Sequence, residues 1–226
     1  MIKMEINRNE ALRYLGVRGK TPDALTAEVV DSCIEEVQRV AEPRQVSRIY
    51  PLQRMEGEGG TCLDGGCFLT QSRNLDRNLR DCEQVLVFAA TLGVGIDRLL
   101  ARYGKIRMSR AIVLQAVSAA AIEGYCNELN REWKEKFLSE GWYLRPRFSP
   151  GYGDFALENQ TSILQGLEAG KWAGITLTDS LLMMPSKSVT AVIGMSRRPA
   201  NCILEGCEVC QKTDCAYRRD RSESKE

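Results

Sequence analysis

The most informative absence in this sequence is histidine, because the 226-residue chain contains none. Histidine is the commonest general base in enzymes and the commonest metal ligand in proteins. The chain also lacks an excess of charge of either sign. Its formal net charge is +1, and no basic face precedes the last ten residues, which disfavours nucleic-acid binding.

Long apolar runs are missing as well. The segment from Val85 to Ala90 is typical of the longest ones, whereas a membrane-spanning helix needs about 18 apolar residues or more. The N-terminal segment MIKMEINRNE is charged and lacks the apolar centre of a signal peptide. We therefore expect a cytoplasmic protein that binds neither membranes nor nucleic acid.

What the chain does contain indicates a folded protein with unusual cysteine usage. Hydrophobic residues make up 43% and charged residues 27%, which is ordinary for a globular domain. Nine cysteines occur, an odd number, without an export signal. Clusters of cysteines in such a chain indicate metal or redox sites before disulfides.

The apolar spacing and the turn residues indicate interleaved helices and strands. Residues 56–66 are rich in glycine and are typical of a hairpin, and Ser72 is placed to cap a helix. Strand-like segments close together along the chain favour antiparallel pairing and hence an α+β domain over residues 1–200. The pattern predicts helices at residues 9–15, 21–42, 72–82, 109–139 and 158–169 and extended segments at residues 46–52, 85–90, 142–147, 175–177 and 189–193.

A glycine-rich turn, Thr91 to Gly95, lies between a predicted buried strand and a helix. A dinucleotide-binding fingerprint requires a third glycine at position 98, which is occupied by Arg98. We therefore favour an ordinary strand-to-helix turn, although its backbone amides are able to line a pocket.

Residues 201–226 form a cysteine-rich tail that ends in a charged segment whose composition is typical of disorder. Four thiols within fourteen residues are able to converge on one metal ion or cluster. Zinc, an iron–sulfur cluster and coincidental unpaired cysteines all stay open at this point. The predicted ligands are Cys202, Cys207, Cys210 and Cys215.

The loop RFSPGYGD, from Arg147 to Asp154, has two interpretations of about equal weight. In the first it is a plain turn, in which Gly151 and Gly153 adopt positive φ and Asp154 caps a downstream element. In the second, a stiff loop with little side-chain cover lets a ligand approach the backbone. The planar fork of Arg147 then suits a carboxylate.

The residues Arg147, Pro150, Gly151 and Tyr152 resemble the S-adenosylmethionine-binding motif of the activation domain of cobalamin-dependent methionine synthase. Three further blocks resemble the same family in the same order, so the resemblance covers roughly Val85 to Ile193. These blocks are residues 86–93 (LVFAATLG), 119–123 (AAAIE) and 174–189 (GITLTDS to MPSKSV).

The resemblance implies a curved domain with a central, mainly antiparallel sheet. It also implies that S-adenosylmethionine is held over a cobalamin on a neighbouring domain. Inactive cob(II)alamin is then reduced by one electron, from a flavodoxin or ferredoxin, and remethylated from the sulfonium. Such a methyl transfer needs no general acid or base, which agrees with the absence of histidine.

The resemblance also implies roles for individual residues. Arg147 matches the arginine that meets the ligand's carboxylate, and Tyr152 matches the tyrosine near its sulfonium or adenosyl part. Ser149 and Gly151 match positions that expose backbone. Glu123 matches a helix acid whose charge suits the ligand's cationic groups. We expect Glu123, Arg147 and Tyr152 to line one pocket.

The chain departs from the family in three places. Residues 1–80 show no match, including the family's acidic contact. Where the family has a pair of tyrosines beyond its final strand, this chain has Arg197 to Pro199 and the cysteine-rich tail. Nothing resembles the cobalamin-binding module, whose axial ligand is a histidine. The sequence therefore predicts a free-standing reactivation subunit, incomplete as an enzyme, for a separate methionine synthase core or other corrinoid protein. The alternative is a non-catalytic interaction module with a zinc-bound tail and a pocket that has lost its function.

Overall fold

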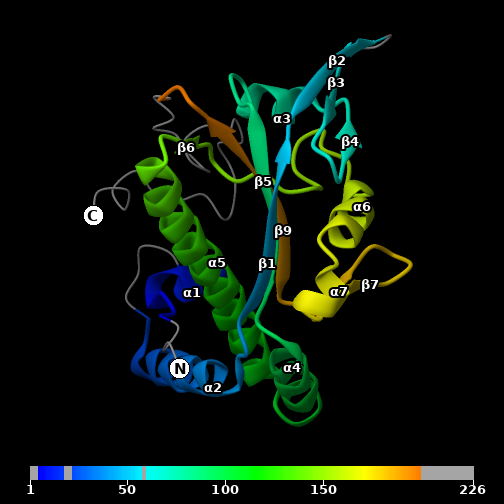
Figure 1. Cartoon of the computed structure of the whole chain (residues 1–226). Helices are drawn as coiled ribbons and strands as arrows, with labels where there is room; N and C mark the ends of the chain where they lie inside the picture. The colour runs from blue at the N-terminus through cyan, green and yellow to red at the C-terminus, as the bar shows by residue number, and fades with distance from the viewer. Residues whose placement is uncertain (1–4, 18–21, 58–59, 200–226) are drawn as a thin grey trace.

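The protein is described from a computed structural model, which covers residues 5–17, 22–57 and 60–199 (Figure 1). Helices and strands of different lengths alternate irregularly along the chain. The helices are α1 (Arg8–Tyr14), α2 (Ala24–Val40), α3 (Arg73–Asn78), α4 (Val94–Ile106), α5 (Met108–Ser139), α6 (Asn159–Gly166) and α7 (Ala169–Trp172). The strands are β1 (Arg44–Pro51), β2 (Gln53–Gly57), β3 (Gly60–Asp64), β4 (Leu69–Thr70), β5 (Gln84–Thr91), β6 (Tyr143–Leu144), β7 (Thr176–Leu177), β8 (Met183–Met184) and β9 (Ser188–Ser196).

A four-stranded sheet with the order β1-β5-β9-β6 forms the centre of the fold, and each neighbouring pair is antiparallel. The predicted α+β class with a central antiparallel sheet is therefore confirmed. The apolar run that began at Val85 becomes β5, which is buried along almost its whole length. Strands buried on both faces have near-continuous apolar sequences, which explains why this run could be recognised.

Side chains of β5 alternate between two hydrophobic clusters, one on each face of the sheet. Leu86, Phe88 and Ala90 pack with residues of α1, α2, α4 and α5. Val85 and Val87 pack with residues of β3, α3, α6 and α7. Figure 1 shows α5 running along one face of the sheet and α6 and α7 covering the other. The period of two along a strand thus divides the core into two layers.

The helix predicted at residues 109–139 is confirmed as α5, and its small residues lie where neighbours approach. Ala120 and Ala121 are buried, and a Cβ atom added to Gly124 would lie 3.3 Å from the carbonyl oxygen of Glu5. Ile112, near the start of α5, lies away from this packed face, since its side chain is 58% exposed.

The helix predicted at residues 158–169 is interrupted. It is split into α6 and α7 because Glu168 adopts a left-handed conformation with φ of 51°. Arg48 stabilises this turn. It pairs with the Glu168 carboxylate and donates a 3.0 Å hydrogen bond to the carbonyl oxygen of Gly166. The sequence around Glu168 could not reveal the break, because the residue that stabilises it, Arg48, lies in β1, 120 positions earlier.

One further boundary differs from the prediction. Helix α3 ends at Asn78 rather than at Cys82, and Arg54 from β2 donates to the carbonyl oxygens of Leu79 and Cys82 just beyond it. Leu25, in the first turn of α2, is 70% exposed although it lies at helical spacing from the buried Cys33 and Val37. Within the described ranges, no helix is both long and apolar enough to cross a membrane.

Candidate functional site

Arg147 lies at the edge of the central sheet, between β6 and the glycine-containing loop. The next residue, Phe148, exchanges two 2.8 Å backbone hydrogen bonds with Val192 of β9. The Phe148 ring packs into the cluster shared with α6 and α7. Since neighbouring residues in an extended segment point to opposite faces, the Arg147 side chain is directed toward α5.

Two acceptors on α5 hold the guanidinium of Arg147. Its Nη2 atom donates to Oε2 of Glu123 at 2.7 Å, and its Nη1 atom donates to Oδ1 of Asn127, also at 2.7 Å. The side chains of Arg147 and Glu123 are 21% and 34% exposed, so the pair is half-buried and open on one side. The structure thus brings together the predicted carboxylate-binding and cation-binding residues.

The loop that follows closes on itself through backbone hydrogen bonds. The amide of Gly151 donates to the carbonyl oxygen of Phe155 at 2.7 Å, and the amide of Tyr152 donates to that of Ser149 at 3.2 Å. These two amides are therefore already hydrogen-bonded within the loop. Both glycines adopt the predicted positive φ, with 88° at Gly151 and 56° at Gly153.

Tyr152 lies in this loop, and it is 67% exposed. It follows Arg147 by five residues, but it does not share the half-buried environment of the arginine and of Glu123. Whether the three side chains line a single binding site therefore stays a prediction.

The prediction that Asp154 caps a downstream element was wrong. Its carboxylate accepts hydrogen bonds from the amides of Arg73, at 2.9 Å, and Asn74, at 3.1 Å, which belong to the first turn of α3, 81 and 80 residues earlier. The hydroxyl of Ser72, the predicted N-cap of α3, also donates to it. Asp154 thereby ties the loop to a helix on the same face of the sheet.

These contacts make the stability contributed by Asp154 dependent on pH. The hydrogen bond from Ser72, followed by those from the two α3 amides, lowers the pKa of the Asp154 carboxyl below its ordinary value. A carboxyl with a lowered pKa stabilises the fold above its ordinary pKa, about 3.9 for aspartate, and loses this effect as the pH falls through the lowered value. We expect Asp154→Ala to reduce the free energy of unfolding at neutral pH by about 1 kcal/mol or less.

Urea denaturation at several pH values measures this difference. The gap between the native protein and Asp154→Ala is expected to close as the pH is lowered below about 4. Asp179→Ala, which removes another exposed aspartate, serves as the control and should show no such gap. A pH-independent difference would mean that the carboxylate is not what secures the loop.

Two residues near the pair were missed by the sequence prediction. Tyr14 of α1 is half-buried, and burial followed by the negative charge of Glu123 raises the pKa of its hydroxyl. Asn127 lies one helical turn after Glu123, and this spacing of four residues was the signal that could have revealed it. Tyr14 carried no such signal, because α1 reaches α5 only through tertiary packing.

The described cysteines do not form a metal site. Cys33, Cys62, Cys67, Cys82 and Cys126 are free thiols, and no group of three or more potential metal ligands gathers among the residues that the structure describes. Burial raises the pKa of Cys126 to about 12, although the positive charge of Arg147 acts in the opposite direction. The predicted ligands Cys202, Cys207, Cys210 and Cys215 lie outside the described residues.

The glycine turn between β5 and α4 is filled by the chain itself. A Cβ atom added to Gly95 would lie 2.4 Å from the carbonyl oxygen of Val40, and one added to Gly93 would lie 3.2 Å from the carbonyl oxygen of Glu42. The amide of Glu42 donates to the carbonyl oxygen of Leu92 at 2.9 Å. Close approach by the end of α2 therefore explains both glycines.

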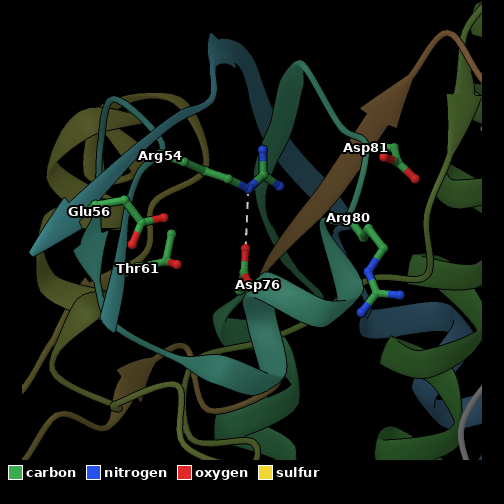
Figure 2. A pocket seen from close by; sticks show the side chains of 6 residues that line it. All are labelled: Arg54, Glu56, Thr61, Asp76, Arg80 and Asp81. Atoms are coloured by element: carbon green, nitrogen blue, oxygen red, sulfur yellow. Dashed lines mark hydrogen bonds and ion pairs between the residues drawn. The ribbon is translucent and has the colours of Figure 1, made fainter. Parts of the chain in front are cut away.

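A polar hollow of about 350 Å³ lies between the β2–β3 hairpin and α3 (Figure 2). Figure 2 shows the Arg54 side chain directed at Asp76, with a 3.2 Å bond between its Nε atom and the carboxylate. None of the predicted ligand-binding residues lines this hollow, and Arg54 is already used to satisfy the end of α3. The lining residues are Arg54, Glu56, Thr61, Asp76, Arg80 and Asp81.

Comparison with known proteins places this chain in a family. Residues 75–220 match the family described as "Vitamin B12 dependent methionine synthase, activation domain". No curated protein matches the chain.

Among solved structures, the fold is similar to the crystal structure described as "MetH Reactivation Domain bound to AdoHcy". The TM-score is 0.60 at 17% sequence identity, over 86% of this chain and 75% of the other. Since residues 75–226 make up only about two-thirds of this chain, the structural likeness extends into the N-terminal region that the sequence did not match. The family match covers more than half of the 226 residues, so this chain belongs to the family of vitamin B12-dependent methionine synthase activation domains.

Proposed function

We propose that this chain binds S-adenosylmethionine beside Arg147 and Glu123 and presents its methyl group to a cobalamin held by a separate protein. The ion pair between these two residues is the observation that carries the proposal. The methionyl end of the ligand has a carboxylate and an ammonium group, which an arginine and a glutamate side by side are able to bind together. Family membership and the likeness to a structure with AdoHcy bound support the choice of ligand.

The proposed chemistry asks the site only to position its ligand. One electron from a reductase partner, of the flavodoxin or ferredoxin class, converts cob(II)alamin into the cob(I) nucleophile. A bond then forms between cobalt and the methyl carbon, the bond from sulfur to that carbon breaks, and S-adenosylhomocysteine leaves with the electron pair. No proton is transferred in this step, so a chain without histidine is adequate.

The composition supports the proposal of a separate cobalamin carrier, the core of a methionine synthase or another corrinoid protein. The cobalamin module of the family supplies a histidine as the lower axial ligand, and none of these 226 residues is a histidine. The exposed loop tip at Tyr152 provides an accessible place from which a methyl group can be presented.

Calorimetric titration with S-adenosylhomocysteine, the stable product, tests the proposal directly. We expect saturable binding to the purified chain, with adenosine binding more weakly because it lacks the amino-acid head group. A titration without heat, together with an unchanged melting temperature at millimolar ligand, would contradict it.

We further propose that the four tail cysteines bind one metal centre. The support is their spacing, since Cys202, Cys207, Cys210 and Cys215 lie within fourteen residues. An iron–sulfur cluster is favoured over zinc because it could pass an electron to cob(II)alamin, which zinc cannot do.

Metal and sulfide analysis after anaerobic purification distinguishes the outcomes. Iron with sulfide and visible absorption is the expected result, and one colourless zinc ion would indicate a structural tail instead. Four thiols that alkylate freely, without any metal, would contradict both forms of the proposal.

A further inference from the structure

Asn127 has no role in the proposed site so far, yet it contacts Arg147 as closely as Glu123 does. Both distances to the guanidinium are 2.7 Å, and each acceptor takes a different terminal nitrogen. The two acceptors lie four residues apart on α5 and therefore on the same side of the helix. The guanidinium is held at both ends of its fork by one rigid element.

The atom of Asn127 that faces the arginine is set by chemistry. A guanidinium has donors only, so the amide must present its oxygen, and its NH₂ group points elsewhere. Of the five N–H donors of Arg147, one goes to Glu123 and one to Asn127. The remaining donors are enough for a ligand carboxylate.

The two acceptors differ in charge, and this difference matters when a zwitterionic ligand arrives. The Glu123 carboxylate attracts the ligand's ammonium group. When it binds that group, its hydrogen bond to Arg147 must be shared or broken. The Asn127 amide is neutral and has no comparable attraction for the ammonium, so it keeps its bond to Nη1. Arg147 is thereby kept in position while its charged partner changes.

We propose that Asn127 is a positioning residue that orients Arg147 for the carboxylate of the ligand's amino-acid head group. This proposal rests on the proposed function, because it assumes that the ligand has such a head group. Asn127 is exposed, so its replacement can be made without disturbing the core.

The test uses two ligands and three variants of the full chain. S-adenosylhomocysteine has the head group, whereas methylthioadenosine lacks it but retains the adenosyl and thioether parts. We expect Asn127→Leu to weaken binding of S-adenosylhomocysteine about tenfold and to leave methylthioadenosine unchanged. Asn127→Gln keeps a neutral amide acceptor and should recover most of the affinity. Gln115→Leu, which removes another exposed amide from α5, is the matched control and should have no effect.

A double-mutant cycle isolates the contact itself. In a chain that already carries Arg147→Ala, Asn127→Leu is expected to cause no further loss, because its partner is gone. If the native chain binds S-adenosylhomocysteine and Asn127→Leu binds it equally well, the positioning role is overturned while the proposed function stands. An equal loss for both ligands also overturns it, since that result indicates a general structural effect. If the native chain binds neither ligand, the proposed function fails and this inference fails with it.

Discussion

Arg147→Ala is expected to lower the affinity for S-adenosylhomocysteine by about 10- to 100-fold. A hydrogen bond to a charged group contributes about 1.5–3 kcal/mol, and each 1.4 kcal/mol corresponds to a factor of ten. Alanine removes the charge that would meet the ligand's carboxylate, and it leaves Glu123 without the partner it has at 2.7 Å. Isothermal titration calorimetry of the two proteins measures the difference.

Arg147→Lys is expected to recover little of this affinity. An ammonium group is a point charge that cannot contact Glu123, Asn127 and a ligand carboxylate in one plane as the fork does. Arg131→Ala, which removes an exposed arginine 3.7 Å from Glu128 and Glu135 on α5, is the control and should bind normally. Equal affinities for the native chain and Arg147→Ala would show that this arginine does not meet the ligand.

Phe88→Ala is expected to have the largest effect on stability, lowering the free energy of unfolding by about 3–5 kcal/mol. Phe88 lies at the middle of β5, is fully buried, and meets the ring of Trp133 of α5 edge-on with the centroids 5.0 Å apart. Its removal leaves a cavity between the sheet and the longest described helix, and the strands on both sides limit how far the cavity can collapse. Urea denaturation monitored by circular dichroism measures the change.

Two variants control for this expectation. Phe88→Leu retains most of the apolar volume and should lose considerably less stability than Phe88→Ala. Trp172→Ala removes an aromatic side chain that is 56% exposed, so its effect should stay within about 1 kcal/mol. A loss below about 1 kcal/mol for Phe88→Ala would mean that the layer between α5 and the sheet is loosely packed.

The pairing of Arg147 with Glu123 illustrates what a resemblance could indicate and what it could not. The motif residues and the helix acid were each predicted to bind a ligand, but the sequence did not show that they contact each other across 24 positions. Nor did it single out Asn127, since an asparagine on an exposed helix face has many uses. The contact exists because β6 and the segment before Phe148 run along β9, beside α5.

Asp154 shows the same division. Its position in a loop, directly after Gly153, favoured a capping role, and that chemistry is confirmed. The prediction failed on which helix it caps, because local spacing favours the next helix and the chain instead reaches back to α3. The glycines at positions 93 and 95 are similar, since the sequence predicted a strand-to-helix turn there but not the neighbour that approaches it, the end of α2.

By itself, the sequence determined the buried strand at Val85, the long helix α5, the cap at Ser72 and the exclusion of histidine chemistry. Each of these depends on apolar periodicity, hydrogen bonding within a few residues, or composition, all of which a single segment carries. Only the tertiary structure decided which helices cover each face of the sheet, where α6 ends, and which side chains meet Arg147. Those outcomes depend on packing and hydrogen bonding between segments far apart in the chain. These segments meet because two layers pack against one sheet.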